Sequence, residues 1–229
     1  MNDYRQNTLS ERAIALNAKK NADLYQKAIS QHGARSLLGA AWTSEERACF
    51  VHEGITNLPQ QNWPELETVL DIGSGQGYFL SFLREKRGFR GKYIGMELLP
   101  EFDKIAKEVH SNDPQADFIC ADFLKYQFGD RKFDWIFSIG SLSPKKPDQE
   151  AFDLVFTEKM AQLANKGFSV FLNDLKYTAP SIIEQVPDAA YHNVEKFAEN
   201  LQKRFPSSEI LVIHYPHETS KDTLVHLIL

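Results

Sequence analysis

Cysteine, basic charge and long apolar runs are all scarce in this chain of 229 residues. Only Cys49 and Cys120 are present, which excludes a disulfide framework and the spacing of a zinc site. No apolar run is long enough to span a membrane, and the polar start, residues 1–6, is not a signal peptide. The histidines show no metal-site spacing. We therefore expect a cytoplasmic protein with no metal site and no membrane contact, in which Cys120 is a small core residue.

The balance of charge is acidic. The chain has 26 lysines and arginines against 31 acidic residues, a net charge of −5, and no long basic run. Lysine and arginine contacts to phosphate supply most of the affinity for nucleic acids, so this composition disfavours a nucleic-acid substrate. A hydrophobic content of 42% is enough to bury one full core.

The most informative stretch of the chain is E-T-V-L-D-I-G-S-G-Q-G-Y-F, residues 67–79. Its first half contains a short apolar run of the kind that forms a buried parallel strand. Gly73, Gly75 and Gly77 then form a turn where backbone can approach a ligand closely. Apolar residues at helical spacing follow from Phe79. A strand, a glycine turn and a helix in this order are typical of a nucleotide-type cofactor site.

The spacing of the glycines distinguishes between cofactors. The dinucleotide fingerprint G-x-G-x-x-G would place its third glycine at position 78, which is Tyr78 here. The observed spacing is instead D-x-G-x-G-x-G, starting at Asp71 and ending at Gly77. This pattern resembles the first motif of the class I S-adenosylmethionine-dependent methyltransferases. A glycine turn alone also occurs in other α/β proteins, so the interpretation depends on the motifs that follow.

Three further strand ends follow in the order expected for this family. Residues 92–97 predict a strand ending at Glu97, whose carboxylate can accept two hydroxyl donors. The resemblance implies that Glu97 binds the ribose hydroxyls and that Leu98 lies against the adenine. A third strand, residues 116–122, ends at Asp122 and is followed by Phe123. Here the resemblance implies contact with the adenine amino group and stacking on its ring, although Phe123 could instead be a core aromatic.

The fourth predicted strand, residues 133–140, ends in small residues near which the family places the transferred methyl group. The resemblance therefore implies S-adenosyl-L-methionine as the cofactor. The residues it assigns to that cofactor are Asp71, Gly73, Ser74, Gly75, Gly77, Glu97, Leu98, Asp122, Phe123 and Ser138.

Alternating strand and helix patterns predict an α/β fold with a doubly wound sheet. Residues 149–163 and 194–205 have helical spacing, and residues 167–174 form a fifth strand. The last two strands, 209–215 and 223–229, are separated by too few residues for a parallel crossover, so they should form an antiparallel hairpin. We expect a seven-stranded, mostly parallel sheet with this C-terminal hairpin, the Rossmann-like methyltransferase fold.

The segment before the first strand is not needed by the core fold. We expect residues 1–62 to form an N-terminal helical cap on a core of residues 63–229. One helix is predicted over residues 9–29 and a second from Thr43, where T-S-E-E has the spacing of a capping box. In similar methyltransferases such helices close over the cofactor and shape the substrate pocket. Trp42 lies in a stretch that resembles a G-W-x-S motif of small-molecule methyltransferases, although a packing role is equally compatible with its sequence context.

The resemblance implies an enzyme that transfers a methyl group to a small-molecule acceptor, mainly by proximity and alignment, because the donor's methyl group is already activated. A base is needed only if the nucleophile arrives protonated. Candidates are Asp174, Lys176, Tyr177 and His192, and Tyr177 is also a candidate for substrate contact; no catalytic residue is assigned. The alternative is a non-catalytic domain that binds S-adenosylmethionine as a sensor or partner subunit. A nicotinamide oxidoreductase is opposed by Tyr78 in place of a glycine.

Overall fold

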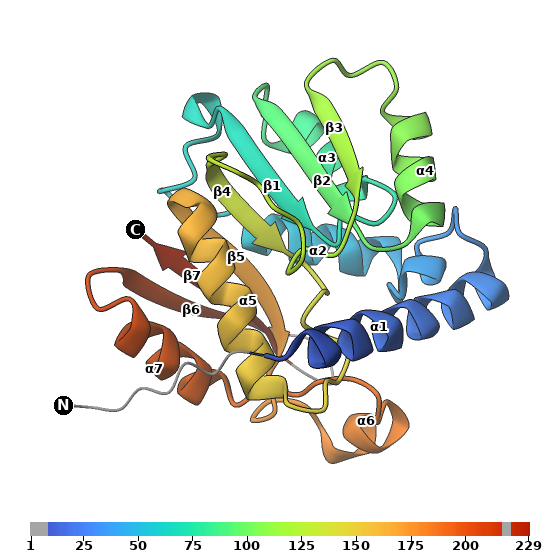
Figure 1. Cartoon of the computed structure of the whole chain (residues 1–229), viewed down its shortest axis with the longest axis vertical. Coiled ribbons are helices and arrows are strands. Elements are labelled where there is room, and N and C mark those ends of the chain that lie inside the picture. Colours follow the sequence, from blue (N-terminus) through green and yellow to red (C-terminus); the bar gives the residue numbers. More distant parts are fainter. Residues whose placement is uncertain (1–8, 217–220) are drawn as a thin grey trace.

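A computed structural model describes residues 9–216 and 221–229 of the chain, and a seven-stranded sheet forms its centre (Figure 1). The strand order is β3-β2-β1-β4-β5-β7-β6. The strands are β1 (Thr68–Ile72), β2 (Lys92–Glu97), β3 (Ala116–Cys120), β4 (Phe133–Ser138), β5 (Ala164–Asn173), β6 (Glu209–Pro216) and β7 (Lys221–Ile228). The first five are parallel, and β7 pairs antiparallel with both β5 and β6. The predicted mostly parallel sheet with a C-terminal antiparallel hairpin is therefore confirmed.

Helices cover both faces of the sheet because its strands carry apolar side chains on both sides. On one face, Val69 and Trp135 belong to a core cluster that includes side chains of α2 (Glu45–Ile55) and α3 (Tyr78–Lys86). On the other, Leu70 and Ile136 belong to a cluster with side chains of α5 (Gln149–Leu163) and α7 (Val194–Arg204). The fold is thus a three-layer sandwich with helices on both sides of one sheet. The remaining helices are α1 (Glu11–His32), η1 (Leu38–Ala40), η2 (Trp63–Glu65), α4 (Pro100–Val109) and α6 (Pro180–Gln185).

Two local predictions are wrong. Helix α2 begins after Ser44 and not at Thr43: Ser44 has extended backbone angles, and its hydroxyl accepts a hydrogen bond of 3.1 Å from the N–H of Arg47. Cys120 is exposed and is not a core residue. The reason is its place in the sheet, because β3 is an edge strand and its last residue has no neighbouring strand on one side.

Helix α1 is the element that completes the site. It begins after Ser10, whose hydroxyl accepts a hydrogen bond from the N–H of Ala13, and it ends at Gly33, where φ is +80°. Figure 1 shows α1 running across the edge of the sheet toward which the arrowheads of β1 to β4 point, from the side of α5 to the side of α4. Among the described residues, no helix is long and apolar enough to cross a membrane.

Candidate active site

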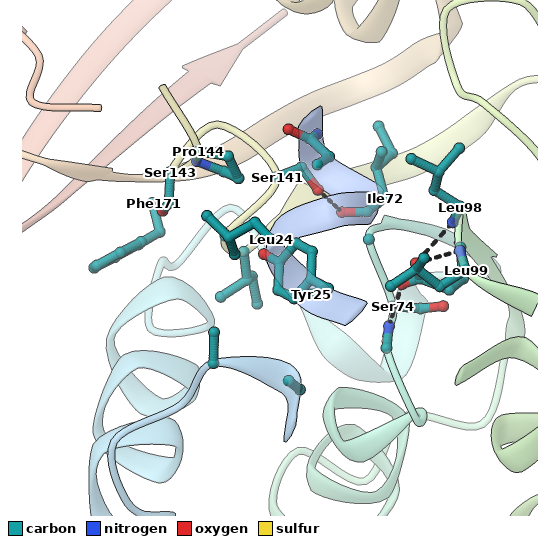
Figure 2. Close-up of a pocket in the computed structure, with 18 of the residues that line it drawn as sticks. Leu24, Tyr25, Ile72, Ser74, Leu98, Leu99, Ser141, Ser143, Pro144 and Phe171 are labelled. Atoms are coloured by element: carbon teal, nitrogen blue, oxygen red, sulfur yellow. Dashed lines mark hydrogen bonds between the residues drawn. The ribbon is translucent and has the colours of Figure 1, made fainter. Parts of the chain in front are cut away.

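A cavity of about 480 Å³ lies at the carboxyl ends of the central strands, with α1 over it (Figure 2). The order of strands reverses between β1 and β4, so their connections leave in opposite directions and open a crevice at this edge. Residues from α1, the turn after β1 and the ends of β2, β4 and β5 line the cavity. Two ligands, or one large one, could therefore share this cavity.

The glycine turn after β1 forms one wall of the cavity. The N–H groups of Gly73 and Ser74 both donate to the carbonyl oxygen of Met96, at 2.8 and 3.2 Å, which ties the turn to β2. Gly73 has a φ of +80°, and a side chain there would place its Cβ 2.2 Å from Ser141 Oγ. Gly75 has a φ of +54° and open space where a Cβ would lie, so its backbone borders the cavity without a side chain in the way.

Glu97 is the best-anchored polar side chain in the cavity. Its Oε1 accepts hydrogen bonds from the N–H groups of Leu98 and Leu99, at 2.7 and 2.9 Å, and its Oε2 accepts one of 2.9 Å from Gly75 (Figure 2). Burial raises the pKa of this carboxyl, and the three N–H groups oppose that rise. A carboxylate offers about four lone-pair sites, so one remains for a ligand hydroxyl. A second hydroxyl could be accepted only if the Gly75 hydrogen bond were released or shared.

The charge of Glu97 acts on two more ionisable groups, Asp71 and Tyr25. Asp71 Oδ2 accepts a hydrogen bond of 2.5 Å from the hydroxyl of Tyr93, and both side chains are buried. Burial raises the pKa of Asp71 to about 7 against the effect of this hydrogen bond, and the charge of Glu97 adds to the rise. Burial and the charge of Glu97 also raise the pKa of Tyr25, on α1. The described lining of the cavity therefore carries the acidic side chains of Asp71, Glu97 and Asp122 near the strand ends, and Arg47 is its basic side chain.

The predicted adenine end of the site is also brought to the cavity. Leu98, Asp122 and Phe123 all line it. Asp122 Oδ1 accepts a hydrogen bond of 2.9 Å from the N–H of Leu124, which fixes the turn after β3. Phe123 is only 5% exposed, and its ring centroid lies 4.9 Å from that of Phe156. Phe123 is thus a core aromatic that also borders the cavity, and its stacking on the adenine stays a prediction.

Gly77 and Ser138 do not line the cavity. A Cβ at Gly77 would lie 2.7 Å from the ring of His110, so this glycine permits close packing behind the turn. Ser138 is fully buried at the end of β4, and its hydroxyl has no hydrogen-bond partner within the described part of the chain. Their proposed contact with the cofactor therefore depends on backbone or on movement near the turn.

The four candidates for a base also lie outside the cavity. Asp174, Lys176 and Tyr177 line a separate hollow against α7 and β6. His192 is paired with Asp153 at 3.1 Å in a third hollow. Asp174 forms a parallel bridge with His192, so these two residues are held together outside the cavity, while Thr178 and Tyr191 of the same segment line it.

Trp42 does line the cavity, and its ring centroid lies 5.7 Å from that of His52, a second lining residue. His52 is buried, and burial lowers its pKa to about 3. The connection that carries Trp42 is tied to the glycine turn by Gln76, whose Nε2 donates to the carbonyl oxygens of Ala34 and Ser36 at 2.8 and 3.1 Å. The N-terminal segment and the turn therefore form one continuous wall.

The N-terminal helices were expected over the cofactor, but none of the residues by which α1 lines the cavity could be named from the sequence. One face of α1 lines the cavity with residues three or four positions apart, which are Ile14, Asn17, Ala18, Asn21, Leu24 and Tyr25. Helical spacing was the available signal for this face. Spacing shows that residues share a face but not what the face covers.

The donor implied by the sequence motifs fits the residues that are present. The open space at Gly75 would admit a ligand against the backbone, and Glu97 has a lone pair left for a hydroxyl. Ser74 lines the cavity with a buried hydroxyl that has no partner among residues 9–216 and 221–229. The polar groups at this end of the cavity therefore have hydrogen-bonding capacity that the described residues do not use.

Comparison with known proteins gives a consistent result. A family model described as "Methyltransferase domain" matches residues 69–167. A 2-methyl-6-phytyl-1,4-hydroquinone methyltransferase of Synechocystis sp. is 28% identical over 172 residues, which is 67% of this chain and 50% of that protein. The chain thus spans about half the length of this curated relative.

Solved structures share the fold at low sequence identity. A magnesium protoporphyrin IX methyltransferase from Synechocystis, solved with bound SAH, has a TM-score of 0.63 at 13% identity, covering 93% of this chain and 96% of that one. The plantazolicin methyltransferase BpumL, in complex with a pentazolic desmethylPZN analog and SAH, also has a TM-score of 0.63 at 13% identity, covering 96% and 99%. At such identities the likeness concerns the fold alone.

Proposed function

We propose that the chain is a class I S-adenosylmethionine-dependent methyltransferase and that it transfers the methyl group of S-adenosylmethionine to a small-molecule acceptor. The observation that carries this proposal is the single cavity in which the glycine turn and Glu97 lie beside a second, mostly apolar compartment under α1. One half suits a nucleoside-type donor, and the other leaves room for an acceptor. The curated relative is named for action on a hydroquinone, which agrees with a small ring compound as acceptor.

The donor would be held by residues from four strand ends. Gly73, Ser74 and Gly75 would contact it through the backbone of the turn, and Glu97 would accept a ribose hydroxyl. Leu98, Asp122 and Phe123 would surround the adenine. The acidic side chains of Glu97 and Asp122 line the cavity here, which suits a cationic ligand. We keep Gly77 and Ser138 as supporting residues of the same turn and strand end.

The chemistry then requires little from the chain beyond placement. When bound, the donor supplies a methyl group already activated by its sulfonium. The chain's task is to align an acceptor atom and to exclude water, and α1 and Trp42, which line the cavity, would contribute to both. His52 is the histidine of the described lining, and its low pKa makes it a weak base. An acceptor that loses its own proton readily, or that carries a free lone pair, would therefore suit this site best.

The alternative is a domain that binds S-adenosylmethionine without transferring its methyl group. Calorimetry with S-adenosylhomocysteine tests the shared requirement, and methyl transfer from a labelled donor into a metabolite extract separates the two. Binding with transfer supports the enzyme, whereas tight binding with no labelled product in any extract fraction supports the sensor. Stabilisation by NADH and not by S-adenosylhomocysteine would overturn both. The division into a cap of residues 1–62 and a core, and the cytoplasmic location, remain predictions.

A further inference from the structure

Two asparagines on α1 lack the hydrogen bonds that buried amides normally make. Asn17 and Asn21 are one helical turn apart, and both line the cavity. Asn17 is only 3% exposed. The buried Oδ1 atom of each has no hydrogen-bond partner in the portions of the chain that the structure describes. Since buried polar groups are usually paired, these amides are suited to pair with a ligand.

The position of α1 indicates which half of the cavity they face. At its C-terminal end, Tyr25 packs edge-to-face on Phe102, with ring centroids 6.3 Å apart, and it is close enough to Glu97 for that charge to raise its pKa. Toward the N-terminus, Leu9 packs against the core cluster of α5 and the strands. At about 1.5 Å of rise per residue, Asn21 and Asn17 lie about 6 and 12 Å along the helix from Tyr25. They therefore face the compartment beyond the donor's ribose.

The walls of that compartment are apolar and aromatic. Pro144 follows β4, Phe171 lies on β5, and Ile182 and Tyr191 lie beyond β5. Figure 2 shows Ser143, Pro144 and Phe171 on the side of the cavity away from Leu98 and Leu99. Flat apolar walls with a few polar groups favour a ring-bearing ligand over a flexible polar one.

Charged groups are sparse in this half. Besides Asp71, Glu97 and Asp122, the charged side chains of the described lining are Arg47 and Asp188. Arg47 already has an interaction partner, and Asp188 is exposed. An amide carries no charge and can either donate or accept, so it matches a hydroxyl or a carbonyl. An anionic acceptor would meet Arg47 as the basic side chain of the described lining, and Arg47 already has a partner.

From this geometry we propose that the compartment under α1 binds an uncharged, ring-bearing acceptor, and that the side-chain amides of Asn17 and Asn21 hydrogen-bond to a hydroxyl or carbonyl oxygen on it. The proposal rests on the proposed function, because it names the acceptor class of the same site. It also assigns Asn17 and Asn21 a role in acceptor specificity and not in donor binding.

The experiment uses the full chain labelled with ¹⁵N and saturated with S-adenosylhomocysteine. The probes are 2-naphthol and 2-naphthoate, which share one ring system and differ in charge. We expect 2-naphthol to shift the side-chain amide signals of Asn17 and Asn21 and to bind more tightly than 2-naphthoate. In Asn17→Leu and Asn21→Leu its Kd should rise about tenfold, the loss expected for one buried hydrogen bond. Asn57→Leu, at an exposed asparagine outside the cavity, is the matched control and should bind as the wild type does.

The outcomes that overturn the proposal are distinct from those that overturn the proposed function. If the asparagine signals respond to S-adenosylhomocysteine and not to 2-naphthol, the pair belongs to the donor site. Preference for 2-naphthoate, or no saturable binding of 2-naphthol, also overturns it. Failure of S-adenosylhomocysteine to bind at all would instead contradict the proposed function. The titration with 2-naphthol is therefore repeated on the protein without S-adenosylhomocysteine, so that the asparagine response is measured independently of donor binding.

Discussion

Replacing Glu97 by glutamine is the sharpest test of the donor site. Glutamine has the size of glutamate and keeps one carbonyl oxygen, so it can still accept from the N–H groups of Leu98 and Leu99. Its NH₂ group would face the N–H of Gly75, which now donates to Oε2 at 2.9 Å. The variant therefore loses the Gly75 hydrogen bond and the charged acceptor for a ribose hydroxyl, with little change in packing.

The expected magnitude follows from these two losses. A hydrogen bond to a charged group contributes about 1.5–3 kcal/mol, so the Kd for S-adenosylhomocysteine should rise about ten- to 150-fold. The unpaired N–H of Gly75 should lower the free energy of unfolding by about 1–3 kcal/mol. Because burial raises the pKa of Glu97, the wild-type affinity should fall on acidification above the range of an ordinary glutamate. The glutamine variant has no carboxyl to protonate at this position and should lack that part of the pH dependence.

Isothermal titration calorimetry measures the affinity, and urea unfolding measures the stability separately. Glu85→Gln is the matched control, since it removes the same charge from an exposed position on α3. It should bind S-adenosylhomocysteine as the wild type does. If Glu97→Gln also binds within about twofold of the wild type, the difference is too small for a lost charged hydrogen bond, and Glu97 does not contact the donor.

Three further predictions concern stability and are measured by urea unfolding. Gly73→Ala should lower the free energy of unfolding by about 1–3 kcal/mol, because its Cβ would lie 2.2 Å from Ser141 Oγ at a φ of +80°. The same decrease in a Ser141→Ala background would contradict the steric cause. Burial lowers the pKa of His52 from 6.5 to about 3, so the unfolded chain binds the extra proton between these values and the wild type should lose stability on acidification. Relative to His52→Leu, the free energy of unfolding of the wild type should fall by at most about 1.4 kcal/mol per pH unit on acidification. Parallel pH profiles of the two proteins would refute this prediction. The pH dependence of stability that is due to Asp71 has the opposite sign, because its pKa is raised from 3.8 to about 7 and the folded state binds the extra proton in that range. Its contribution to the free energy of unfolding is complete below pH 3.8 and is lost as pH rises through about 7. Relative to Asp71→Asn, the free energy of unfolding of the wild type should therefore fall between pH 5 and 8 by at most about 1.4 kcal/mol per pH unit. Equal pH profiles of the two proteins would show that the pKa of Asp71 is not raised.

Much of the fold could be predicted because its signals are local. Helix α5 has the bounds that its apolar spacing predicts, residues 149–163, and β2 ends at Glu97 as expected. The short link between the last two strands already required an antiparallel hairpin, which the structure confirms. The glycine turn and Glu97 could also be placed together, because parallel strands end at the same edge of a sheet.

The tertiary structure alone decided which side chains complete the cavity. Asn17, Asn21 and Tyr25 line it because α1 crosses the sheet edge, and no spacing in the sequence records what a helix face covers. Tyr177 and His192 have suitable chemistry for the site, but they line separate hollows, while their chain neighbours Thr178 and Tyr191 line the cavity. Periodicity and motif spacing depend on neighbours along the chain, so they identify the donor's side of the cavity. The acceptor's side is built from segments far apart in sequence, and its shape follows only from how they pack.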